Sequence, residues 1–120
     1  MNKYPVVTLC GSTKFKEDFL KVQKELTLKG YIVISVGLFE HSGDDEVWEG
    51  KPEDTYTDTK LMLDDLHLRK IDMADSIFVI NKNGYIGEST RREIEYATSH
   101  GKKVMYLEPI SCEDHYDALL

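Results

Sequence analysis

Hydrophobic residues form four short, largely continuous runs along this chain of 120 residues, and each run has the length of a β-strand. Such runs are typical of strands that are buried on both faces, as they are in a parallel sheet. They predict strands over residues 5–10, 31–36, 76–80 and 103–107.

Between these runs, hydrophobic residues recur at the spacing of amphipathic helices, with charged residues on the opposite side. The predicted helices cover residues 13–29, 56–74 and 89–100. The repeating positions are Phe15, Phe19, Val22 and Leu26 in the first helix, and Leu63, His67 and Ile71 in the second. Glycines at positions 30 and 101 stand where helix C-caps are expected.

The alternation of strands and helices predicts an α/β fold, a single domain over residues 1–120 with a doubly wound, Rossmann-like parallel sheet of four to five strands. We expect the strand order 2-1-3-4. In that order the chain reverses direction between strands 1 and 3, and ligands of open α/β sheets bind in the crevice at such a point.

Two segments lack a clear period. Residues 37–55 form a long acidic stretch that contains Trp48, and it is either a lid over the crevice or a solvated loop with Trp48 anchored in the core. The tail, residues 110–120, is expected to form a short helix from Ser111 onward.

Composition narrows the classes of partner. A net charge of −7 and a pI near 5.0 argue against nucleic acid or an anionic membrane as the main partner, although small anionic ligands remain open. No hydrophobic run approaches the length of a membrane helix, and the N-terminus lacks the apolar core of a signal peptide. Cys10 and Cys112 form no metal or redox motif. We therefore expect a cytoplasmic protein that needs neither a metal nor an organic cofactor.

Two glycine-bearing loops follow predicted strands 1 and 3, where the crevice is expected. The first, Gly11 to Lys14, presents backbone N–H groups and hydroxyls that suit a phosphate, but such a turn is more often a helix N-cap. The second precedes a helix that brings Glu93, in its expected first turn, beside the crevice. Thr90 to Glu93 also matches a capping box, in which Glu93 only reaches back to the Thr90 backbone.

Four short motifs, in order along nearly the whole chain apart from residues 37–55 and the tail, resemble the nucleoside 2-deoxyribosyltransferase superfamily, which includes deoxynucleoside monophosphate N-glycosidases. The motifs are Leu9-Cys10-Gly11-Ser12, Ile71-Asp72-Met73-Ala74-Asp75-Ser76-Ile77, Gly84-Tyr85-Ile86-Gly87 and the segment from Glu93 to Lys102. The resemblance implies a flavodoxin-like fold and a homodimer or higher homo-oligomer. It also implies that Glu93 is a nucleophile that attacks C1′ of a deoxyribose and forms a covalent glycosyl intermediate.

The sequence departs from the transferase pattern at two positions. His67 stands where the resemblance implies an aspartate, so it is either a general acid or a buried core histidine. Gly87 replaces an expected acidic residue, with Glu88 one place away. Lys14 and the hydroxyls of Ser89 and Thr90 resemble the pattern of the monophosphate glycosidases, which bind a 5′-phosphate, more than that of the transferases.

These patterns leave three functions open: a deoxynucleoside glycosyl transferase or hydrolase, a hydrolase specific for 5′-monophosphates, and a non-catalytic nucleotide-binding module. All three take a small nucleoside or nucleotide. The expected catalytic residues are Glu93 and His67, and the expected substrate-binding residues are Cys10, Gly11, Ser12, Lys14, Asn81, Gly84, Tyr85, Gly87, Glu88, Ser89 and Thr90.

Overall fold

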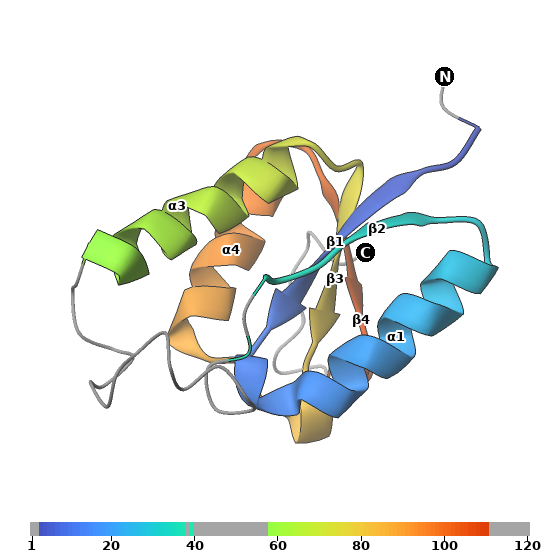
Figure 1. The fold of residues 1–120 in the computed structure, drawn as a ribbon, viewed down its shortest axis with the longest axis horizontal. Helices are drawn as coiled ribbons and strands as arrows, with labels where there is room; N and C mark the ends of the chain where they lie inside the picture. The colour runs from blue at the N-terminus through green and yellow to red at the C-terminus, as the bar shows by residue number, and fades with distance from the viewer. Residues whose placement is uncertain (1–2, 38, 40–57, 111–120) are drawn as a thin grey trace.

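A four-stranded parallel sheet forms the centre of the protein in a computed structural model, which describes residues 3–37, 39 and 58–110 (Figure 1). The strands are β1 Val6–Gly11, β2 Ile32–Ile34, β3 Ser76–Ile80 and β4 Lys103–Tyr106. Their order is β2-β1-β3-β4, which confirms the predicted doubly wound arrangement. The predicted short helix in the tail, and nearly all of the predicted lid with Trp48, lie outside the described residues.

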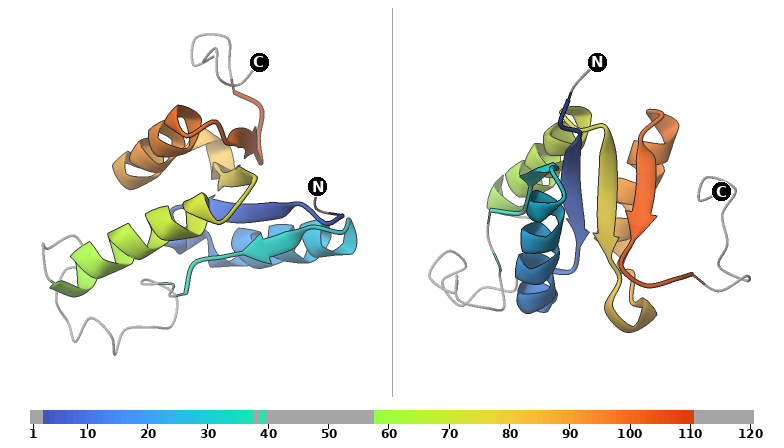
Figure 2. Two further views of the ribbon diagram at one scale, coloured as in Figure 1. Left: turned by 90° about the horizontal axis from the view of Figure 1, so that it is seen from above. Right: turned by 90° about the vertical axis from the view of Figure 1, so that its right-hand side faces the viewer.

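Helices cover both faces of the sheet. The helical elements are η1 Thr13–Phe15, α1 Lys16–Leu28, α3 Asp58–Asp72, η2 Lys82–Gly84 and α4 Glu88–Ser99. Figures 1 and 2 show α1 on one face of the sheet, and α3 and α4 on the other. The described helices begin and end within a few residues of their predicted positions, and the first one starts with a 3-10 turn.

The core has one layer on each side of the sheet, because successive residues of a strand point to opposite faces. Val7 and Leu9 of β1 pack with Phe19 of α1, whereas Cys10 packs with Ile71 of α3 and with residues of α4. Both faces of the sheet are therefore covered by apolar residues. This explains why the strand sequences are continuous hydrophobic runs rather than alternating ones.

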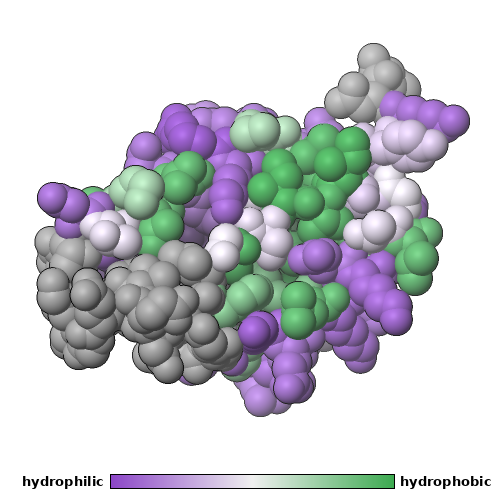
Figure 3. Space-filling model, viewed as in Figure 1, coloured by the Kyte–Doolittle hydropathy of each residue, from purple (hydrophilic) through white to green (hydrophobic). Residues whose placement is uncertain are grey.

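On the side of the molecule seen in Figure 1, the hydrophobic surface residues do not form one continuous face. Figure 3 shows hydrophobic residues there in separate patches among hydrophilic ones. Within the described ranges, no helix combines the length and the apolar character needed to cross a membrane. The homo-oligomer implied by the resemblance stays a prediction.

Candidate functional site

A pocket of about 350 Å³ lies beyond the C-terminal ends of β1 and β3, where the strand order reverses. Its wall is built from the loop after β1, from Val36 and Gly37 after β2, from one side of α3, and from the segment that leads into α4. This volume lies within the range of small-molecule sites, which tend to occur at this position in doubly wound sheets.

Gly11 allows β1 to end close against β3. Its φ is +147°, and a Cβ atom there would lie 2.9 Å from the carbonyl oxygen of Ile80. The chain then turns into the pocket wall at Ser12, whose Oγ accepts a hydrogen bond from the Lys14 backbone N–H at 3.4 Å. Ser12 therefore caps the 3-10 turn, as the simpler interpretation of this loop predicts, and it also lines the pocket.

Helix α4 begins one residue earlier than the sequence predicts. Its N-cap is Gly87, which is extended and makes no side-chain capping bond. Glu93 therefore lies in the second turn rather than the first, and the predicted capping box with Thr90 is wrong. The Glu93 side chain instead contacts residues of β1 and α3.

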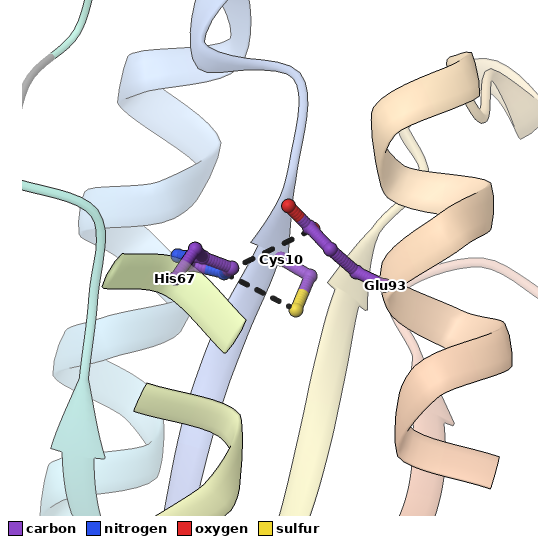
Figure 4. Close-up of side chains that lie close together, drawn as sticks. All are labelled: Cys10, His67 and Glu93. Atoms are coloured by element: carbon purple, nitrogen blue, oxygen red, sulfur yellow. Dashed lines mark hydrogen bonds and ion pairs between the residues drawn. The ribbon is translucent and has the colours of Figure 1, made fainter. Parts of the chain in front are cut away.

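Cys10, His67 and Glu93 meet at the inner end of the pocket, from β1, α3 and α4 respectively (Figure 4). Cys10 Sγ lies 3.4 Å from His67 Nε2, and the same nitrogen lies 3.9 Å from Glu93 Oε1. Cys10 is fully buried, His67 is 8% exposed, and the Glu93 side chain is 18% exposed toward the pocket that it lines. Reactive groups thus meet where little water can reach them.

Burial controls the charges in this cluster. It raises the pKa of Glu93 to about 7, against a lowering contribution from the Cys10 hydrogen bond. It lowers the pKa of His67 to about 4, helped by the positive charge of Lys70. Burial also raises the pKa of the Cys10 thiol well above its usual value, and the Glu93 carboxylate adds to this. Near neutral pH the thiol and the imidazole are therefore uncharged, and only Glu93 titrates.

Helix α3 supplies charged groups that the sequence patterns did not single out. Lys60 Nζ donates to both oxygens of Asp64, at 2.9 and 3.0 Å, and both residues line the pocket. Lys70 also lines it and donates to the Ser35 carbonyl at 2.9 Å, and burial lowers the pKa of its ammonium. The signal that would have found them is their helical spacing from His67, which places them on the side of α3 that lines the pocket.

Most of the site residues predicted from the sequence line the pocket, whereas Lys14, Gly84 and Asn81 do not contribute to it. Those that line the pocket are Gly11, Ser12, His67, Tyr85, Gly87, Glu88, Ser89, Thr90 and Glu93. Lys14 and Gly84 are not part of the lining, and the Lys14 ammonium instead lies 3.9 Å from the centre of the Tyr85 ring. Asn81 is buried and exchanges two hydrogen bonds with the Glu108 backbone, at 3.0 and 2.9 Å, which ties the end of β3 to the segment after β4.

No protein-family model matches this chain, and a comparison with curated proteins finds no match. The superfamily resemblance therefore depends on the short motifs alone. The fold and the pocket define an α/β protein with a cavity of small-molecule size, one wall of which contains the Glu93 carboxylate.

Proposed function

We propose that this protein cleaves or exchanges the N-glycosidic bond of a deoxyribonucleoside, with Glu93 as the nucleophile. The observation that carries the proposal is the position of the Glu93 carboxylate: it lines a pocket of small-molecule size, and on its other side it contacts the Cys10 thiol, with His67 Nε2 3.9 Å away. A carboxylate held in this way is pre-oriented for attack on a bound sugar.

The reaction proceeds in two displacements. A Glu93 oxygen bonds to C1′ as the bond from C1′ to the base nitrogen breaks, and the electron pair leaves with the base, which takes a proton from solvent. Water, or a second base, then attacks C1′ and releases the carboxylate. Positive charge grows on the sugar in both transition states, beside the negative charge of the Glu93 carboxylate. Asp64 also lines the pocket, but its carboxylate is paired with Lys60.

A chromatographic assay on a panel of substrates tests this function. The purified protein is incubated with deoxynucleosides and their 5′-monophosphates, with and without a second free base. We expect release of free base, or formation of a new nucleoside when an acceptor base is present. If nothing is released while a ligand still raises the melting temperature, the protein is a non-catalytic binding module and the proposal is wrong.

A hydrolase specific for 5′-monophosphates is the second candidate. It is favoured by cationic and hydrogen-bonding groups on the pocket wall: Lys70 from α3, and the N-terminal turn of α4 with Ser89 and Thr90. Ammonium groups and helix N-termini both favour a phosphate dianion. The sequence predicts Lys14 for this role. In the structure Lys70 lines the pocket, whereas the Lys14 ammonium lies over the Tyr85 ring.

If a phosphate binds beside Lys70, Lys70→Met will raise the KM for a deoxynucleoside 5′-monophosphate by about tenfold, since one charge-assisted contact is lost. The KM for the matching nucleoside should not change. Lys24→Met, on the exposed side of α1, is the control and should leave both values unchanged. Equal KM changes for nucleotide and nucleoside would show that Lys70 does not contact a phosphate.

A further inference from the structure

We propose that Cys10, His67 and Glu93 form a binding site for a zinc ion, with one coordination position open to the pocket. The three side chains offer one sulfur, one nitrogen and one oxygen donor, and these atoms lie within 4.8 Å of one another. Figure 4 shows the three side chains converging from separate elements of the fold. In the described parts of the chain, no other group of three such side chains is placed to hold a metal ion.

The separation of the sulfur and nitrogen donors matches a tetrahedral ion, and that of the nitrogen and oxygen donors is somewhat longer. With bonds of about 2.3 Å to sulfur and about 2.0 Å to nitrogen and oxygen, a tetrahedral zinc separates sulfur from nitrogen by about 3.5 Å, and nitrogen from oxygen by about 3.3 Å. The observed distances are 3.4 Å from Cys10 Sγ to His67 Nε2 and 3.9 Å from His67 Nε2 to Glu93 Oε1. The nitrogen-to-oxygen separation exceeds the tetrahedral value by roughly 0.6 Å, and all three donor atoms lie within 4.8 Å of one another, so the Glu93 side chain must rotate toward the other two ligands to complete the site.

The donor types select zinc over harder cations. Thiolate and imidazole together are typical zinc ligands, whereas magnesium and calcium prefer oxygen donors alone. Binding displaces the proton of the Cys10 thiol, because a coordinating thiol is held as the thiolate. A thiolate and a carboxylate then balance the two positive charges of the ion, so the buried cluster carries no net charge.

The surroundings hold the ligands in place. Cys10 belongs to β1, in the interior of the sheet, and His67 is a buried residue of α3, so two of the three ligands come from regular elements of the core. His67 and Glu93 both line the pocket, so the fourth coordination position faces it. Three protein ligands with one open position is the pattern of zinc sites that bind a water or a small ligand.

Zinc binding has one consequence that depends on the proposed function. A Glu93 oxygen that is bound to zinc cannot attack a sugar, so zinc should inhibit glycosyl chemistry. The metal site itself does not depend on that function, and it is tested without substrate.

The test is a titration of metal-stripped protein with Co²⁺, which replaces zinc and absorbs light when bound to a thiolate. We expect one ion per chain, the thiolate-to-cobalt absorption band, and loss of that band when Zn²⁺ is added. Loss of an outer partner of a metal ligand already costs about 10- to 100-fold in affinity, so Cys10→Ser should weaken binding at least about 100-fold and abolish the band. Cys112→Ser, which changes the other cysteine of the chain, is the matched control and should keep both.

A band that persists in Cys10→Ser and disappears in Cys112→Ser would overturn the site, as would the absence of binding at one ion per chain. Circular dichroism of Cys10→Ser shows whether that variant is folded, and His67→Gln provides a second ligand deletion if it is not. Cobalt binding without base release from any substrate would leave the metal site standing and remove the proposed function. Base release without cobalt binding would do the reverse.

Discussion

Glu93→Gln is expected to lower kcat for base release by at least about 1,000-fold, since removal of a covalent nucleophile eliminates the intermediate through which the reaction proceeds. Glutamine has nearly the same shape but carries no negative charge, so the pocket should keep its form and still bind nucleoside. Binding is followed by calorimetry and turnover by chromatography, both in the presence of a chelator so that no bound metal changes the result.

The same variant should be more stable than the parent protein at pH 8. Burial raises the pKa of Glu93 from 4.5 to about 7, so between these values the folded state holds a proton that the unfolded state has released. Stability therefore falls as the pH rises through this window, and the loss is complete above pH 7. Removing the charge should recover on the order of 2 kcal/mol at pH 8, and little at pH 4, measured by urea unfolding.

Glu95→Gln is the matched control, because Glu95 lies on the same helix but is exposed to solvent. It should change neither turnover nor the pH dependence of stability. Turnover that survives in Glu93→Gln would exclude Glu93 as the nucleophile. An unchanged stability at pH 8 would show that the carboxylate is better solvated than its buried position indicates.

The fold could be predicted because the two inner strands, β1 and β3, are buried on both faces. Continuous hydrophobic runs, separated by helical periods, leave few arrangements other than a doubly wound parallel sheet. Helix starts were less certain: α4 begins at Glu88 because the extended Gly87 serves as its cap, whereas the sequence also offers Thr90 as a capping residue. Local patterns do not decide between neighbouring caps, because the packing of the whole helix contributes to the choice.

The candidate site could be predicted only in part. The two glycine loops and Glu93 were found because the ends of parallel strands meet at one edge of the sheet. The contact between Cys10 and His67 depends on how α3 lies across β1, and residues 57 positions apart give no local signal of it. Asn81 shows the opposite case: the sequence analysis expects it to bind substrate, but its side chain makes both of its hydrogen bonds to the Glu108 backbone.

Gly11→Ala should lower the free energy of unfolding by about 2–5 kcal/mol, as the sum of backbone strain at positive φ and overpacking in the core. The φ of +147° favours glycine, and the new Cβ would meet two atoms of Ile80, the carbonyl oxygen at 2.9 Å and Cβ at 3.0 Å. Both atoms belong to β3, which is paired with β1 at this position, so neither can move aside cheaply. Thermal and urea unfolding measure the effect.

Gly37→Ala is the control for this substitution. Gly37 also lines the pocket, but its φ is not positive and an added Cβ would meet nothing within 4 Å. Its stability should change by less than about 0.5 kcal/mol. Equal stability of the two variants would mean that β1 and β3 can separate at the pocket edge without cost. The pocket would then not be rigid enough to hold Glu93 beside a sugar, since positioning of the carboxylate depends on that close approach.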